Sequence, residues 1–136
     1  MEGVVIDTNV FVAAGFNAKS ASARILASIR ERRLQLVWNE PTRRETRFVL
    51  RRIPPLGGEK FADLFAPEGE FTGRVDPGNF IFIEDPDDRK FAALSAAAKV
   101  PLVTNDHHLL AHRNHQGFDV LTPRALLARA AGAPSS

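Results

Sequence analysis

Two acidic residues stand at the ends of short segments whose apolar residues predict buried strands. Asp7 follows the run at residues 4–6, and Asp106 follows a segment of the same layout at residues 101–105. A continuous β-branched run suits a strand that is covered on both faces. Residues just past the carboxyl ends of parallel strands line the ligand crevice, so neighbouring strands would bring Asp7 and Asp106 into one site. Turn chemistry is the alternative for Asp7, because Asp and Asn side chains bond nearby backbone groups.

A third carboxylate, Glu45, lies within the apolar face of a helix predicted over residues 39–52. Counting by three and four along this helix places Glu45 in the middle of a stripe formed by Pro41, Phe48, Val49 and Ile53. A carboxylate that faces the protein body costs free energy unless it is paired or binds a metal. A salt bridge to a neighbouring arginine is the structural alternative.

The segment Asp85-Pro86-Asp87-Asp88 opens another predicted helix, with Asp85 as its N-cap. Acids in a first turn also stabilise a helix against its dipole, by a few tenths of a kcal/mol to about 1 kcal/mol. At least one of the three aspartates is therefore expected to be only structural. Helical phase does not choose between Asp87 and Asp88 as the residue that faces the site.

Four positions would then meet at one edge of the sheet: Asp7, Glu45, one of Asp87 and Asp88, and Asp106. Two like charges about 4 Å apart repel by roughly 4 kcal/mol near a protein surface. A divalent cation removes this repulsion, and oxygen ligands with water fit Mg²⁺ or Mn²⁺ rather than zinc. Because such a cation can activate water and stabilise the leaving oxygen of a phosphodiester, the pattern predicts metal-dependent hydrolysis.

Strand and helix patterns alternate along the chain. The predicted strands cover residues 4–6, 34–38, 80–83, 101–103 and 120–121. The predicted helices cover residues 20–33, 39–52, 59–65, 86–98, 107–112 and 123–131, with a surface loop at 67–78. This alternation favours an α/β fold with a mostly parallel sheet and helices on both faces. We expect one domain over residues 1–131 and a frayed tail over residues 132–136.

Composition excludes several classes of protein. The 136 residues include no cysteine, so there is neither a disulfide framework nor a thiolate zinc site, and nothing favours secretion. No basic segment followed by an apolar core opens the chain, and no apolar run approaches the roughly 20 residues of a membrane span. A net charge of +2 does not by itself indicate nucleic acid. We expect a cytoplasmic protein with no membrane partner.

The acidic segments together resemble the four motif regions of PIN domains. They cover residues 4–10, 39–45, 85–94 and 102–110, in that order and over nearly the whole chain. The likeness is to the bacterial branch that includes toxins of toxin–antitoxin pairs. It implies a three-layer α/β/α fold with a five-stranded, mostly parallel sheet, and Mg²⁺- or Mn²⁺-dependent endonuclease activity on single-stranded RNA. The implied products carry 5′-phosphate and 3′-hydroxyl ends, and the implied partners are a small antitoxin and a second copy of the chain.

Carried over position by position, the resemblance assigns the catalytic acids to Asp7, Glu45, Asp88 and Asp106. Of these, Asp7, Asp88 and Asp106 would hold the metal. Asp88 is preferred to Asp87 because the family pattern has an acid three residues before the apolar residue that precedes two alanines. The supporting residues would be Asn9, Thr104, Asn105 and Asp87. Glycine is frequent in the family where this chain has Asn105.

Basic residues cluster on the helix predicted over residues 39–52. Arg43, Arg44 and Arg47 are the candidates for contacts with RNA phosphates, and a solvated helix face is an equal alternative. The four histidines lie within residues 107–115, where RNA stacking or phosphate contact is favoured over a transition-metal site.

Two other functions stay open. A phosphohydrolase would use Asp7 as a covalent nucleophile, but such enzymes usually need a second aspartate two residues on, where this chain has Asn9. A domain of the same fold that only binds RNA or a protein partner is opposed by the presence of all four acids.

Overall fold

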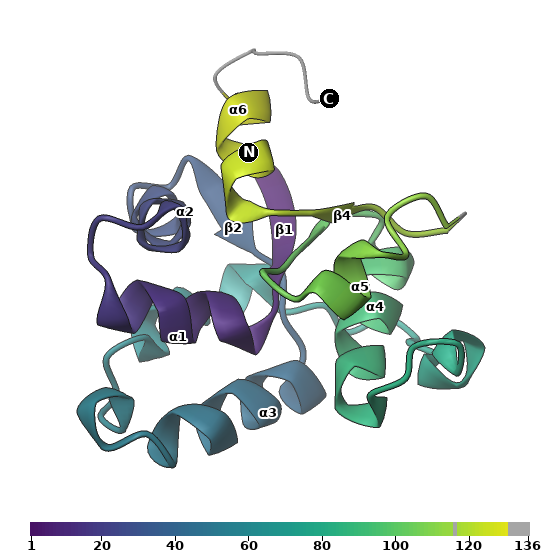
Figure 1. The fold of residues 1–136 in the computed structure, drawn as a ribbon, viewed down its shortest axis with the longest axis horizontal. Helices are drawn as coiled ribbons and strands as arrows, with labels where there is room; N and C mark the ends of the chain where they lie inside the picture. The colour runs from purple at the N-terminus through teal and green to yellow at the C-terminus, as the bar shows by residue number, and fades with distance from the viewer. Residues whose placement is uncertain (116, 131–136) are drawn as a thin grey trace.

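Four short parallel strands form the sheet. The computed structural model describes residues 1–115 and 117–130. Its strands are β1 (Glu2–Ile6), β2 (Leu34–Leu36), β3 (Leu102–Val103) and β4 (Val120–Leu121), in the order β2-β1-β3-β4. All pairings are parallel, and β1 pairs with both β2 and β3. Figure 1 labels β2, β1 and β4 of this sheet. The predicted parallel sheet is confirmed, but within the described residues it has four strands and not five.

The strand predicted over residues 80–83 does not form. Phe80 instead ends a 3-10 helix (Pro77–Phe80), and the chain then turns towards the next helix. Arg89 holds this turn, because its Nε donates to the carbonyl oxygen of Ile83 at 2.8 Å and its Nη2 to that of Ile81 at 3.2 Å. These carbonyls are therefore engaged by a side chain and not by a neighbouring strand. Phe80 and Ile83 are buried three residues apart, which is the spacing of a turn.

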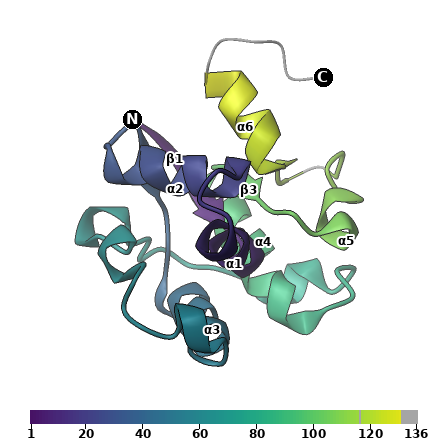
Figure 2. The ribbon, with the colours of Figure 1, turned by 60° about the vertical axis from the view of Figure 1, so that its left-hand side comes forward.

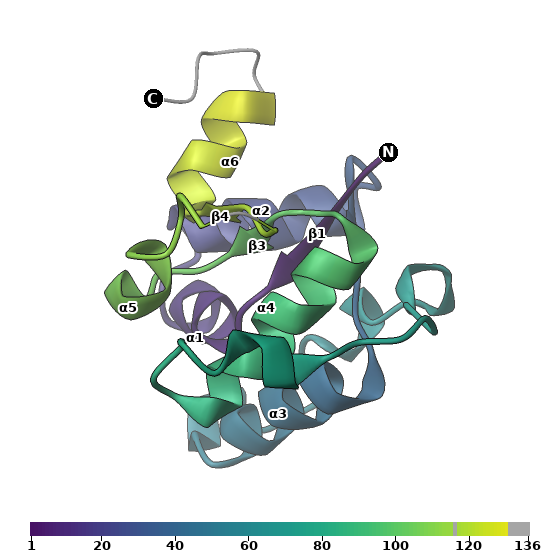
Figure 3. The same ribbon diagram turned by 90° about the vertical axis from the view of Figure 1, so that its right-hand side faces the viewer.

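Helices cover both faces of the sheet, as the alternation of patterns predicts. α4 (Pro86–Ala98) packs on one face, where Val5 of β1 joins an apolar cluster with Phe91. α1 (Thr8–Phe16), α2 (Ala21–Arg30) and α6 (Pro123–Ala130) lie on the other face, around Val4 and Ile6. Figure 3 shows α4 in front of the strands, with α1 and α2 behind them. Successive residues of β1 thus point into opposite layers, and the α/β/α architecture is confirmed.

α3 (Glu40–Arg51) lies beyond the carboxyl ends of the strands, where it contacts α1 and α4. The predicted cap is confirmed, because the Asn39 side chain accepts a hydrogen bond from Thr42 N at 3.2 Å. The hydroxyls of Thr8 and Thr46, 2.9 Å apart, join α1 to α3. Figure 2 shows α1 between α2 and α3. α5 (His107–Leu110) begins where the helix over residues 107–112 is predicted and ends two residues earlier.

Several helix boundaries differ from the predicted ones. The patterns predict no helix over α1, whereas Asp7 caps it by accepting a hydrogen bond from Thr8 N. The helix predicted over residues 20–33 ends at Arg30, since Arg32 has a φ of 60° and turns the chain into β2. Residues 59–65 contain only a 3-10 helix (Ala62–Leu64), and further 3-10 helices cover Pro54–Leu56 and Pro67–Gly69. α6 begins where predicted, and the tail predicted from residue 132 lies outside the described residues.

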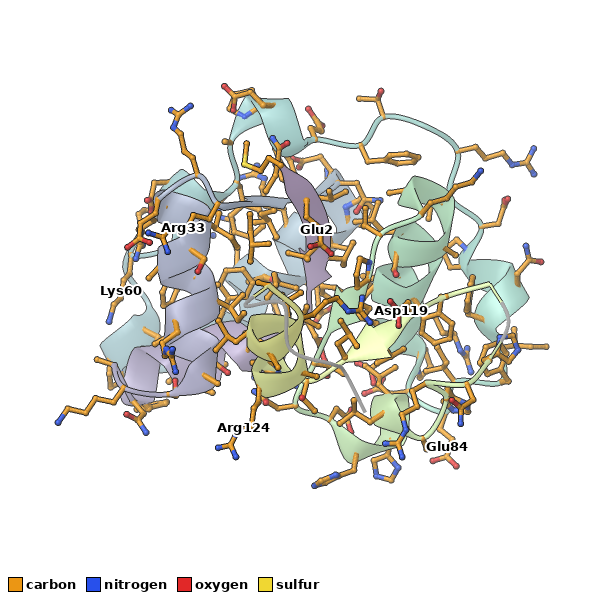
Figure 4. All side chains as sticks on the ribbon, turned by 90° about the horizontal axis from the view of Figure 1, so that it is seen from above. Glu2, Arg33, Lys60, Glu84, Asp119 and Arg124 are labelled. Atoms are coloured by element: carbon orange, nitrogen blue, oxygen red, sulfur yellow. The ribbon has the colours of Figure 1, made fainter. Side chains whose placement is uncertain are left out.

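The amino ends and the carboxyl ends of the strands face opposite sides of the molecule. Figure 4 looks onto the amino ends of the strands, with Glu2 and Asp119 labelled beside β1 and β4. The carboxyl ends face the opposite way, towards α3 and the start of α4 (Figure 1).

α4 is the longest helix in the described part of the chain, with 13 residues, and no helix there could cross a bilayer.

Candidate active site

A cavity of about 670 Å³ opens at the carboxyl ends of β1 and β3. Residues of α1, α2, α3 and the start of α4 surround it. Its acidic lining residues are Asp7, Glu45, Asp85, Asp87, Asp88 and Asp106. The structure therefore brings together every acid that the sequence analysis selected, including both members of the pair that helical phase leaves open. No lysine, arginine or histidine is among the described residues that line the cavity.

Asp7 is the most buried of these acids, with 4% of its surface exposed. Its Oδ1 accepts a hydrogen bond from Thr8 N at 2.8 Å, and its Oδ2 accepts one from Thr104 Oγ1 at 2.7 Å. Burial raises the pKa of Asp7 from 3.8 to about 6. The two hydrogen bonds oppose this shift, and the charges of Asp106 and Asp85 add to it. The carboxylate is thus fixed in orientation but costly to ionise without a cation.

The Thr104 hydroxyl connects the ends of β1 and β3. Besides donating to Asp7, it accepts hydrogen bonds from Asp106 N at 3.0 Å and from Asn9 Nδ2 at 3.3 Å. The Asn9 side chain in turn accepts a hydrogen bond from Asn105 N at 3.1 Å. The predicted supporting residues Asn9, Thr104 and Asn105 therefore form one network around Asp7, a placement that suits a positioning role.

Asp106 enters the cavity from the start of α5. Its Oδ1 accepts a hydrogen bond from His108 N at 2.9 Å, so it caps this short helix. Its backbone N–H is held by Thr104. The negative charge of Asp106 raises the pKa values of both Asp7 and Asp88, so the three carboxylates interact electrostatically.

The start of α4 supplies three acids in different surroundings. Asp85 is the N-cap, as predicted, and accepts a hydrogen bond from Asp87 N at 2.9 Å. Asp88 is partly buried, and its pKa is raised from 3.8 to about 7. Burial is the largest cause of this shift, and the nearby negative charges, first among them that of Asp7, supply the rest. Asp87 is exposed. Burial and charge therefore favour Asp88 over Asp87 as the acid that works with Asp7.

Glu45 reaches the cavity, but the helix that carries it is rotated relative to the predicted apolar stripe. The buried residues of α3 are Thr42, Thr46 and Leu50. Pro41 is exposed, and so is Phe48, to 58%. The Glu45 side chain is 20% exposed and accepts a hydrogen bond from Lys90 Nζ at 3.0 Å. The alternative salt bridge therefore exists, with a lysine of α4 in place of an arginine.

The donor set fits a hard divalent cation. Among the described residues, Asp7, Asp88 and Asp106 have no ion-pair partner. Burial and mutual repulsion raise the pKa values of Asp7 and Asp88, and a cation would offset both costs. In the same part of the chain, no three His, Cys, Asp or Glu side chains form a group that could hold a metal ion as they stand. Mg²⁺ does not require such a group, because it typically binds one or two carboxylates and keeps several waters.

The arginines predicted to bind RNA lie outside the cavity lining and carry acidic partners. Arg43 Nε lies 2.9 Å from Glu40 Oε1, and Arg44 Nε lies 3.7 Å from Glu40 Oε2. Arg47 Nη2 lies 3.4 Å from Glu59 Oε1. These ion pairs match the solvated helix face that the sequence offers as an alternative. A role in RNA binding stays a prediction.

Three residues that contribute to the site are not identified as such by the sequence patterns. Lys90 pairs with Glu45, and a base two residues after Asp88 was the available signal. Asp85 is predicted only as a cap, although its carboxylate also lines the cavity. Ser22 is buried in α2 and accepts a hydrogen bond from Asn105 Nδ2 at 3.1 Å. Nothing in the sequence distinguishes Ser22 from the other serines of the chain.

Comparison with known proteins agrees with this geometry. The crystal structure of PAE2754 from Pyrobaculum aerophilum has a similar fold, with a TM-score of 0.57 and 18% sequence identity over 96% of this chain and 98% of that chain. No curated protein matches the chain. A family model described as the PIN domain matches residues 3–108, a span that contains all six acids of the cavity. Because this match covers well over half of the sequence, the chain belongs to the PIN domain family.

Proposed function

We propose that this protein is a metal-dependent endoribonuclease that hydrolyses single-stranded RNA. The observation that carries the proposal is the crowding of Asp7, Asp88 and Asp106 in one cavity, with no basic side chain among its described lining residues. Such a site is suited to a divalent cation, and then to the phosphodiester that the cation binds. PIN domains are generally nucleases, which supports the same chemistry.

The residues would divide the work as follows. Asp7 and Asp106 would hold the cation, since Thr104 fixes both of them. A bound Mg²⁺ or Mn²⁺ would supply an activated water and neutralise charge at the phosphorus. Asp88 lines the same cavity beside these two acids, and its carboxylate could accept a proton from the attacking water as a general base. Glu45 would orient the water shell, and the products would carry 5′-phosphate and 3′-hydroxyl ends.

The surroundings of Asp7 support a metal ligand rather than a covalent nucleophile. Both of its carboxylate oxygens accept hydrogen bonds, and only 4% of the residue is exposed. Phosphorus carries four oxygens and needs a wide approach to an attacking carboxylate, whereas a small cation can reach the remaining lone pair of a buried, hydrogen-bonded oxygen.

The test is cleavage of an end-labelled single-stranded RNA in Mg²⁺, in Mn²⁺ and in EDTA. Asp7→Asn and Asp88→Asn are compared with Asp76→Asn, a matched control whose carboxylate does not line the cavity. We expect metal-dependent cleavage by the wild type and by the control, and none by the other two variants. Equal cleavage by Asp7→Asn would contradict the proposed site.

We further propose that the protein acts in the cytoplasm as the toxin of a toxin–antitoxin pair, and as a homodimer. Phe16 of α1 and Phe48 of α3 are 62% and 58% exposed, and α1 packs against α3, so apolar surface is available for a protein partner. Light scattering measures the molar mass of the purified protein in solution and so tests the proposed dimer. Co-expression with the small protein encoded beside it measures the pairing, and RNA cleavage that this neighbour does not inhibit would contradict the toxin role.

A further inference from the structure

The cavity has more room and a more varied lining than hydrolysis alone requires. A cation with six waters occupies roughly 200 Å³, at about 30 Å³ per water, which leaves most of the 670 Å³ free. Besides the acids, four partly exposed apolar residues line it: Val12, Ala13, Ala21 and Val49. Cation, water and phosphate contact oxygen ligands and make no use of an apolar surface. A flat ring with polar edges, such as a nucleobase, would use it.

Asn105 also lines the cavity, and its carboxamide is held by one hydrogen bond while its other hydrogen-bonding groups stay unpaired among the described residues. Its Nδ2 donates to Ser22 Oγ at 3.1 Å, and its backbone N donates to Asn9 Oδ1 at 3.1 Å. Ser22 is only 3% exposed, so the anchor belongs to the body of α2. The Asn105 carbonyl Oδ1 has no hydrogen-bond partner among the described residues, and the second Nδ2 hydrogen has none there either. The side chain is exposed.

A free acceptor beside a free donor is what a base edge requires. The carboxamide of asparagine pairs with base edges through these two groups, and such pairs discriminate between bases. Single-stranded RNA presents its bases unpaired, with both the edges and the ring faces accessible to protein. The apolar residues of the cavity match the faces, and the Asn105 amide matches an edge.

We propose that Asn105 reads the base of a nucleotide next to the cleaved phosphodiester, while Val12 and Val49 pack against that base. This inference rests on the proposed function, since it assumes an RNA strand in the cavity. It makes Asn105 a specificity-determining residue and Ser22 the residue that orients its amide. Cleavage would then be base-selective.

The test compares four short single-stranded RNAs, each made of one base only. Cleavage in Mg²⁺ and binding in EDTA are measured for the wild type, Asn105→Ala and Ser22→Ala. Asn79→Ala is the control, because Asn79 is exposed and does not line the cavity. The readout is the ratio between the best and the worst RNA for each protein. Since this ratio is internal to one protein, a general loss of activity or of folded protein does not change it.

We expect a ratio of roughly fivefold or more for the wild type and for Asn79→Ala, given the discrimination that one carboxamide–base pair provides. The ratio should fall close to one for Asn105→Ala and to an intermediate value for Ser22→Ala. A preference that Asn105→Ala retains, or equal treatment of the four RNAs by the wild type, overturns the inference and leaves metal-dependent cleavage untouched. Selective, Asn105-dependent binding without cleavage supports the inference and contradicts the nuclease.

Discussion

Replacing Asp7 with asparagine is expected to stabilise the metal-free protein at neutral pH. In the unfolded chain the Asp7 carboxyl ionises at its ordinary pKa of 3.8, whereas burial raises the pKa in the folded protein to about 6. The difference is about 2 pKa units. At 1.36 kcal/mol per unit, ionisation costs the folded state roughly 3 kcal/mol above pH 6. An asparagine side chain has no such cost.

One hydrogen bond opposes this gain. Asparagine keeps an oxygen for Thr8 N, but it turns an NH₂ group towards Thr104 Oγ1, which already accepts from Asn9 and from Asp106 N. Losing the bond from Thr104 to residue 7 costs about 1 kcal/mol. The net gain is therefore about 2 kcal/mol, or on the order of 5 °C in melting temperature for a chain of this size.

The pH dependence of stability separates the cost of ionising Asp7 from the cost of losing the Thr104 hydrogen bond. Because the folded-state pKa of Asp7 is raised, the folded wild type binds the proton more tightly than the unfolded chain does. The corresponding stability is complete below pH 4 and is lost as the pH rises through 6. Asp7→Asn should therefore be no more stable than the wild type near pH 4, and should gain its full advantage above pH 7.

Urea denaturation in EDTA, from pH 4 to pH 8, measures this difference, with Asp76→Asn as the control. Subtracting the wild type from the variant at each pH cancels the titration of all other groups except those that Asp7 itself perturbs, chiefly Asp88. A variant that is less stable than the wild type by the same amount at both ends of the range would refute burial of charge as the cause.

Three further predictions concern the Thr104 hydrogen bonds, the binding of a cation and the close backbone contact at Gly69. Thr104→Val should lower the free energy of unfolding by about 2 kcal/mol, because Asp7 loses a donor and two N–H groups lose an acceptor; an unchanged thermal transition would contradict the network. Cation binding should release protons and tighten from pH 6 to pH 8, since the pKa values of Asp7 and Asp88 are raised; calorimetry in two buffers of different ionisation enthalpy measures the release, and its absence would refute carboxylate ligation. Gly69→Ala should destabilise the fold by about 1–3 kcal/mol, because the added methyl would overlap the carbonyl oxygen of Leu36; a native melting temperature would show that this backbone can shift freely.

The convergence of the acids could be predicted because it depends on rules of local sequence. A short apolar strand leads to an acid at both Asp7 and Asp106, and parallel strands place such acids at one edge. Asp85 and Asn39 are recognisable caps, each followed by a proline in the first turn. Each of these signals consists of residues that are close together in the chain, so it can be recognised without knowledge of the tertiary structure.

The rest depends on contacts between distant residues. Residues 80–83 have the composition of a strand, but Arg89 engages two of their carbonyls and the segment turns. The rotation of α3 follows from Thr46, whose hydroxyl pairs with that of Thr8 across 38 positions, and a count of apolar residues treats both threonines as surface. Lys90 meets Glu45 across 45 positions. Such pairings are decided by the packed structure and leave no periodic trace in the sequence.

Three of the cavity acids are also helix N-caps: Asp7 for α1, Asp85 for α4 and Asp106 for α5. Mutational drift in this chain is therefore constrained in a particular way. A descendant that lost the proposed nuclease activity would still need a side-chain oxygen at these positions to cap its helices, and asparagine, serine or threonine would meet that need. A polar cavity would outlast the activity, so the presence of polar residues there is weaker evidence of catalysis in a relative than the presence of an acid at position 88, which caps no helix.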